Sequence, residues 1–368
     1  MTLPKRVACP DCSLVQTLPA IADHEVARCR RCQRVLQVPE AQSRASAALV
    51  LAAMLLWIPG CLAPLLTVSA GGANRSANLI GCAVKLWSNG YPPLCLLVVI
   101  LMIAVPTGFM LLTLAQLLPG ISASSLRGCR LLAHYLRPWL MMEVFVVGGC
   151  VAYSRMQAVA DVSIDTGGWC LAGAAVFLLG SLALRGDPPA EPDTPRSTKV
   201  SLGLTTLLVI AGLLLYIPAN VLPVLQIERY GSTEKNTILG GVVELVHYDL
   251  WPLAVIVFVA SVVVPLAKLF GLAWLLWQTQ RRSPRLLRQR TGVYRFIEAI
   301  GRWSNIDVFT ISILAALVQF GFLTRVRPES GALAFAGVVL LTMIAAQCFD
   351  PRSMWLAAAT QPVPERRT

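Results

Sequence analysis

The chain has 368 residues, of which 56% are apolar and 14% are charged, well below the roughly one quarter charged that is typical of a soluble domain. Its net charge is +12, but the basic residues are spread over many segments, which argues against a nucleic-acid-binding face. No nucleotide-binding, zinc-protease or serine-hydrolase motif is present, so the sequence does not indicate an enzyme.

The chain begins with a cluster of four cysteines. Cys9 and Cys12 form one CxxC motif, and Cys29 and Cys32 form a second one after sixteen residues. Two such motifs can present four thiolates to one tetrahedral metal ion. A segment this small cannot build its own apolar core, so metal binding would supply about 10–16 kcal/mol toward its folding. The spacing predicts a zinc ribbon over residues 1–44 that holds one structural zinc ion.

Two other interpretations of the cysteine cluster stay open. A redox pair needs one CxxC motif on a βαβ scaffold, which this segment does not indicate. An iron centre would use the same four sulfurs. The other seven cysteines of the eleven stand singly in or beside apolar stretches, where cysteine behaves as a small apolar side chain.

Long uncharged stretches follow the cysteine cluster. They cover residues 45–74, 86–126, 166–184, 200–227, 250–267 and 330–349. A membrane-spanning helix needs about 20 mostly apolar residues. Two weaker stretches, 138–160 and 305–322, each contain one acidic residue near the start, Glu143 and Asp307. The sequence therefore predicts an all-α polytopic membrane protein with eight transmembrane helices.

The basic residues predict the orientation of these spans. If the N-terminus is inside and eight spans alternate, the inside segments contain 23 Lys and Arg residues and the outside loops contain six. Basic residues accumulate in cytoplasmic loops. Both termini are therefore expected in the cytoplasm.

The chain also repeats itself at a nearly fixed offset. One constant shift places Pro59 on Pro218, and after a short insertion a slightly larger shift places Glu143 on Asp307. Each copy holds an even number of spans, so the copies are expected to be parallel four-helix repeats. The predicted segments are two four-span modules, 45–185 and 200–349, a proline-rich cytosolic linker, 186–199, and a cytosolic tail, 350–368.

Polar residues inside spans are costly and mark candidate functional positions. Lys268 lies inside one span of the second module, and Asp307 lies at the start of the next. We expect them to pair as a protonatable couple whose state biases a conformational change. Structural roles stay open, because Lys268 could extend toward headgroups and Asp307 could stabilise a helix N-terminus. The predicted polar cluster comprises Lys268, Asp307, Ser304, Ser261, Thr342 and Glu143.

Several motifs together resemble the paraquat-inducible protein A family. They are the cysteine cluster ahead of a doubled four-span module, the Pro-x4-Pro turn, the run GRWSNIDVF at 301–309, and Phe349-Asp350-Pro351-Arg352. The resemblance implies a Gram-negative inner-membrane subunit. It also implies a periplasm-spanning partner with mammalian-cell-entry (MCE) domains, with which it moves phospholipids between the two membranes and maintains envelope integrity.

The chain departs from the family pattern in one respect. Many relatives carry a second cysteine ribbon ahead of the second module, but residues 186–199 contain no cysteine. Two other functions also stay open. The cysteine cluster could serve a redox-responsive or stress-responsive membrane sensor, and parallel repeats could carry a small solute.

Overall fold

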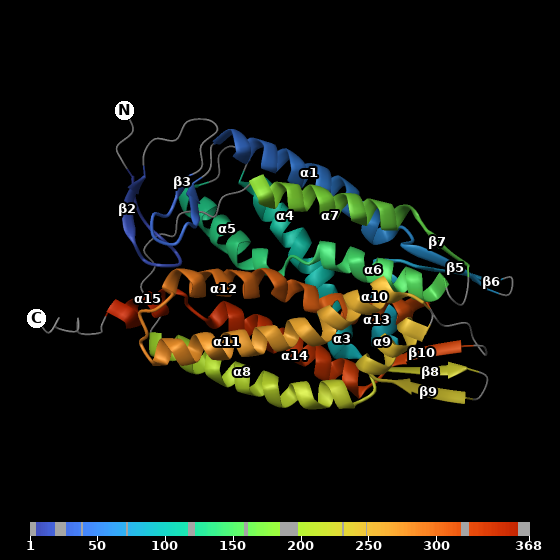
Figure 1. Ribbon diagram of the computed structural model, residues 1–368. Helices are drawn as coiled ribbons and strands as arrows, with labels where there is room; N and C mark the ends of the chain where they lie inside the picture. The colour runs from blue at the N-terminus through green and yellow to red at the C-terminus, as the bar shows by residue number, and fades with distance from the viewer. Residues whose placement is uncertain are drawn as a thin grey trace, which may run out of the picture.

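The computed structural model describes residues 5–18, 27–37, 40–70, 73–116, 122–157, 161–184, 198–229, 232–247, 249–317 and 324–359. In these ranges, seven helices are long and apolar enough to cross a membrane. The chain is thus a mostly helical, multi-pass membrane protein. The helices run between the cysteine hairpins, here called the ribbon end, and two small β-sheets, here called the sheet end (Figure 1).

The first half of the helical region combines long spans with shorter connecting helices. In chain order its elements are α1 (Glu40–Leu62), α2 (Leu79–Ser88), α3 (Pro92–Val98), the π-helix η1 (Val99–Ala104), α4 (Val105–Ala115), α5 (Ala123–Leu136), the 3-10 helix η2 (Arg137–Trp139), α6 (Met142–Gln157) and α7 (Thr166–Leu184). Of these, α3, η1 and α4 form one continuous span.

The second half repeats this order of elements. They are α8 (Thr198–Val221), α9 (Ile238–His247), α10 (Trp251–Phe258), the π-helix η3 (Val259–Val263), α11 (Val264–Gln280), α12 (Leu287–Ile300), the 3-10 helix η4 (Gly301–Asn305), α13 (Ile306–Leu317), α14 (Ser330–Cys348) and α15 (Arg352–Ala359). Helix α9 follows α2 at the offset that separates Pro218 from Pro59, and α12 and α14 follow α5 and α7 at the offset that separates Asp307 from Glu143. Among the described helices of this half, α15 is the one without a counterpart.

The eighth predicted span corresponds to α13. Its described part has 12 residues, and positions 318–323 lie outside the described residues. The count of eight spans therefore stays a prediction. The linker up to position 197 and the tail from position 360 also lie outside the described residues.

A three-stranded antiparallel sheet follows the first span of each half. The strands are β5 (Leu66–Ala70), β6 (Ala73–Ala77) and β7 (Asp161–Ile164) in the order β6-β5-β7, and β8 (Leu225–Arg229), β9 (Ser232–Asn236) and β10 (Thr324–Pro328) in the order β10-β8-β9. Pro59 and Pro218 lie close to the C-terminal ends of α1 and α8. Proline weakens helix hydrogen bonding at these positions, and each helix gives way to the first strand of its sheet.

The two halves meet where α6 packs against α13. Phe145 and Phe309, which occupy equivalent positions in the two halves, contact edge to face with ring centroids 5.5 Å apart. Thr310 donates to the carbonyl of Gly148 at 3.2 Å, and a Cβ added at Gly148 would lie 3.2 Å from the carbonyl oxygen of Ile306. The small residue permits this close backbone approach, as in other membrane helix pairs.

The long second span of each half contains a π-turn next to a proline. Val105 donates its N–H to the carbonyl of Ile100, and Val264 donates to that of Val259, in each case five residues back. The following residues, Pro106 and Pro265, lack an N–H, and their rings crowd the carbonyl four residues back. A wider turn accommodates this crowding, and such turns are frequent at functional sites.

Equivalent glycines lie at the start of the last span of each half. A Cβ added at Gly167 would lie 2.5 Å from the carbonyl oxygens of Ala63 and Pro64, and one added at Gly331 would lie 2.6 Å from that of Pro223. The backbone N–H of Gly331 donates to the same Pro223 carbonyl at 3.0 Å. Only glycine fits this contact, because backbone atoms cannot rotate away as a side chain can.

We expect Gly331→Ala to destabilise the protein by about 1–3 kcal/mol, the usual cost of overpacking, and to lower its melting temperature in detergent. Gly203→Ala is the matched control, because nothing in the described structure lies within 4 Å of a Cβ added at Gly203 in α8. Equal melting temperatures for the two variants would contradict the close backbone contact assigned to Gly331.

Candidate metal centre and intramembrane polar site

Two similar turns bring the four cysteines together. Strands β1 (Lys5–Ala8) and β2 (Val15–Leu18) form the hairpin around the first pair, and β3 (Ala27–Arg28) and β4 (Val35–Gln37) form the hairpin around the second. In each turn one residue, Ser13 or Gln33, has a positive φ of 57° or 63°. Its N–H donates at 2.9 Å to the carbonyl of the first cysteine of its pair, Cys9 or Cys29.

The four sulfurs lie in the arrangement that a tetrahedral metal requires. All four Sγ atoms are within 4.8 Å of one another, and all four side chains are buried. The Sγ atoms of Cys9 and Cys32 are 3.4 Å apart, and those of Cys12 and Cys29 are 3.6 Å apart. A tetrahedron with metal–sulfur bonds of about 2.3 Å has edges of about 3.8 Å. The four free thiols therefore fit one metal ion.

A carboxylate inside the first CxxC motif connects this centre to the helices. Asp11 is 2% exposed, and its carboxylate pairs with Arg34 at 2.6 Å and with Arg295 of α12 at 2.6 Å. Nη2 of Arg295 also lies 3.3 Å from the Sγ of Cys32. Hydrogen bonds to ligand atoms orient a metal site. Sequence reasoning missed Asp11 and Arg295, because nothing in the spacing of either residue marks the contact.

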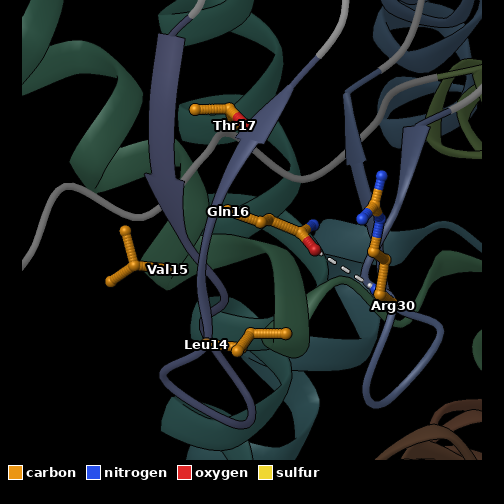
Figure 2. Close-up of a pocket in the computed structure, with 5 residues that line it drawn as sticks. All are labelled: Leu14, Val15, Gln16, Thr17 and Arg30. Carbon is orange, nitrogen blue, oxygen red and sulfur yellow. Dashed lines mark hydrogen bonds between the residues drawn. The ribbon is translucent and has the colours of Figure 1, made fainter.

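An open groove lies between the two hairpins of the ribbon (Figure 2). It is lined by Leu14, Val15, Gln16, Thr17 and Arg30. The side-chain oxygen of Gln16 accepts a hydrogen bond from the backbone N–H of Arg30 at 3.3 Å. This bond joins the two hairpins, and the cysteines do not line the groove.

Inside the helical region, η4 brings two of the predicted polar residues to one acceptor. Lys268 in α11 is 0% exposed, and its Nζ donates to the carbonyl of Gly301 at 3.3 Å. The hydroxyl of Ser304 donates to the same carbonyl at 2.9 Å. An ammonium group has three donors, so one protein acceptor satisfies only part of its capacity.

Asp307 has a separate set of neighbours. Its carboxylate accepts a hydrogen bond from Ser261, which lies in the π-turn η3. The guanidinium of Arg155, near the end of α6, is close enough to interact electrostatically with Asp307. The Nε of Arg155 is buried and has no hydrogen-bond partner among the described residues. The first half thus supplies a positive charge to this carboxylate.

Among the described contacts, the two charged residues that the sequence suggested as a couple are not joined. Lys268 bonds to Gly301, six residues before Asp307, whereas Asp307 bonds to Ser261. Thr342 is fully buried and donates to Val339 in its own helix at 2.9 Å. The predicted cluster is therefore divided into smaller groups.

Glu143 forms an ion pair that crosses between the halves. Its carboxylate lies 2.9 Å from Nη1 of Arg302 in η4. The same guanidinium donates to the carbonyl of Leu140 at 3.4 Å. Sequence reasoning included Glu143 but not Arg302, although Arg302 lies in the GRWSNIDVF run.

Asn305 is a further buried polar residue that sequence reasoning did not identify. Its Nδ2 lies 3.0 Å from the sulfur of Met141 and 3.5 Å from that of Met343, and its Oδ1 has no hydrogen-bond partner in the described part of the chain. Asn305 also lies in the GRWSNIDVF run. The signal that could have identified Asn305 was its position, as an uncharged polar residue, at the start of the predicted span 305–322.

These features define a multi-pass helical membrane protein with a four-cysteine cluster that can bind a metal ion and with buried charges between two similar halves. The chain belongs to the paraquat-inducible protein A family, whose sequence profile matches residues 44–186 and 202–359. The two matched segments correspond to the two halves, and the resemblance inferred from the motifs is confirmed.

Relatives with assigned names align along nearly the whole chain. The intermembrane transport protein PqiA of Escherichia coli (strain K12) is 30% identical, over 95% of each chain. The lipophilic envelope-spanning tunnel protein A of the same strain is 26% identical, over 94% of this chain and 90% of the relative. A probable intermembrane transport protein of Haemophilus influenzae is 24% identical, over 95% and 96%. These relatives are named as transport or tunnel proteins, not as enzymes. No solved structure matches the chain.

We expect the double variant Cys9→Ser/Cys29→Ser to lose its bound metal, because it removes one thiolate from each pair and leaves two of four ligands. Purified wild-type protein should contain about one metal ion per chain by elemental mass spectrometry, the number that one four-cysteine site holds. Cys150→Ser, at an exposed cysteine in α6, is the control and should keep the ion. Unchanged metal content in the double variant would exclude the cluster as the metal site.

We expect Lys268→Met to keep or raise the melting temperature, because it removes a buried charge and Ser304 still satisfies the Gly301 carbonyl. Arg302→Met should lower the melting temperature, since the loss of its partner leaves Glu143 largely buried and unpaired, at a cost of about 1–3 kcal/mol. Thermal unfolding in detergent measures both. A larger loss for Lys268→Met than for Arg302→Met would contradict the assignment.

Proposed function

We propose that this chain is the inner-membrane subunit of an MCE-type system that moves phospholipids between the inner and outer membranes of a Gram-negative bacterium. The main support is the alignment along about 95% of the chain with proteins named for intermembrane transport and for an envelope-spanning tunnel. Buried charges also favour a transport role over simple anchoring, because such groups are costly in a membrane protein and usually serve function.

We further propose eight spans in two parallel four-helix modules, with both termini and the ribbon in the cytoplasm. The recurrence of element bounds at nearly fixed offsets supports the two modules, and α13 would supply the eighth span. The loop between α11 and α12 is rich in arginine and lies toward the ribbon end, as cytoplasmic loops are. The ribbon would hold one structural zinc ion, because four thiolates are a typical structural zinc donor set.

In this proposal the second module carries the active step. Its buried polar positions Ser261, Lys268, Ser304 and Thr342 are matched in the first module by the apolar residues Met102, Phe109, Leu140 and Leu178. The carboxylate of Asp307 and the ammonium of Lys268 each have few partners in an apolar surrounding. A change in the charge of either group would alter which helix contacts are favourable, and so would bias a conformational change that admits lipid.

We expect affinity-tagged protein to co-purify with an MCE-domain protein and with phospholipid. In a strain that relies on this protein, Asp307→Asn and Lys268→Ala should reach normal abundance but fail to restore growth under envelope stress. Ser312→Ala is the matched control and should restore growth, because Ser312 is buried in the same helix as Asp307 and donates within that helix.

Other outcomes would favour the other functions. A purified protein that carries a bound small solute, and neither phospholipid nor an MCE partner, would indicate a solute carrier. Loss of an oxidant response at unchanged abundance in Cys9→Ser/Cys29→Ser would indicate a sensor. Normal growth of both Asp307→Asn and Lys268→Ala would overturn the active role of the intramembrane residues.

A further inference from the structure

The ribbon precedes the first half in the chain but contacts the second. Its Asp11 carboxylate pairs with Arg295 of α12 at 2.6 Å, and its Pro10 carbonyl accepts from Nε of Arg352 of α15 at 2.8 Å. The guanidinium of Arg31 lies 4.0 Å from the ring centroid of Trp355. One turn of the ribbon thus binds α12 and α15, and the other stacks on α15.

Apolar packing supports these polar contacts. Trp355 is 7% exposed and packs in one cluster with the four cysteines and with Val7 and Leu36 of the ribbon. Its indole N–H donates to the hydroxyl of Thr291 in α12 at 3.2 Å. Leu287, the first residue of α12, packs against the same cluster. The contact is therefore a packed interface and not a single surface ion pair.

The helix that the ribbon contacts leads directly into the intramembrane polar site. α12 ends at Ile300, and η4 begins at Gly301, whose carbonyl accepts from Lys268. Arg295 lies six residues before Gly301, about 9 Å along a helix. Tyr294 donates to the carbonyl of Ala346 in α14 at 3.0 Å, and burial raises the pKa of this phenol well above its usual range, so it stays a donor.

We propose that Arg295 is a positioning residue that links the metal-bound ribbon to α12. It thereby holds η4 in place, so that the Gly301 carbonyl can accept from Lys268. The guanidinium of Arg295 contacts both the Asp11 carboxylate at 2.6 Å and the Sγ of Cys32 at 3.3 Å, and hydrogen bonds to ligand atoms orient a metal site. Without metal the ribbon has no core of its own to keep it folded, and Asp11 would lose its fixed place beside Arg295. The state of the metal site would then affect the order of α12 and η4.

The single ribbon therefore packs against a defined part of the chain, the second half. The linker 186–199 contains no cysteine, so the chain has no four-cysteine cluster directly ahead of its second half. The N-terminal ribbon instead contacts the half that contains Lys268, Ser261 and Asp307. These contacts do not depend on the proposed transport activity, and hydrogen exchange, which tests them, does not measure transport.

The test is hydrogen–deuterium exchange of the full-length, metal-loaded protein in lipid nanodiscs. We expect Arg295→Gln to retain about one metal ion per chain and to speed amide exchange in residues 287–305 by about tenfold or more, because these helix amides open more often once the tie is lost. Arg295→Lys should restore part of the protection, since a lysine can pair with Asp11 as a point charge but not as a planar fork. The strands of the sheet end should be unaffected.

Arg288→Gln is the matched control, because Arg288 is an exposed arginine on the same helix. It should leave exchange unchanged. If Arg295→Gln loses its metal, the same comparison is made with metal-loaded Arg295→Lys, which keeps a positive charge beside Asp11 and should exchange at a rate between those of wild type and of metal-stripped protein. Exchange in residues 287–305 that equals wild type, both in the metal-retaining variant and in metal-stripped wild-type protein, would overturn the proposal.

Discussion

The carbonyl of Gly301 is the acceptor for the buried ammonium group of the second half and for the neighbouring Ser304 hydroxyl. An ammonium group in the apolar interior is costly unless it donates to something, and Lys268 donates to this carbonyl. Two other residues of η4 also form polar contacts near this carbonyl. Ser304 donates to the same oxygen, and Arg302 pairs with Glu143 across the two halves. A short 3-10 segment therefore provides partners for charges on α11 and α6, and its placement decides whether those charges are satisfied.

The two halves share a backbone design but differ in chemistry. Both contain a π-turn next to a proline, and both contain a glycine at which an added Cβ would collide with backbone carbonyl oxygens. These features therefore belong to the fold itself. Ser261 occupies the π-turn of the second half, where its hydroxyl reaches Asp307, whereas the equivalent Met102 has no hydroxyl to donate. The two halves thus share these backbone features although buried polar positions of the second half are apolar in the first, where Met102, Phe109 and Leu140 belong to the core.

The metal centre shows how contacts between distant parts of the chain add to local design. The cysteine pairs and their two turns are formed within about 25 residues of sequence, as is usual for such small metal modules. The attachment of the ribbon is not local, since Arg295 and Arg352 belong to the C-terminal part of the chain and reach back to Asp11 and Pro10. A ribbon held by an ion pair, a stacked ring and an apolar cluster together is better positioned than one held by a single exposed ion pair, which contributes little.

Short-range patterns along the chain were enough to predict several properties of this protein. Seven of the expected apolar spans and the four-cysteine cluster follow from hydropathy and spacing, as does the inclusion of Lys268 and Asp307 among the buried polar residues. The partners of these residues became evident from the packed helices. Lys268 was expected to meet Asp307 but meets Gly301, and Arg302 and Arg155 approach the acids from the opposite half. Partner choice depends on which way each side chain points once the helices have packed, and spacing along one chain does not specify how two helices are rotated and offset against each other.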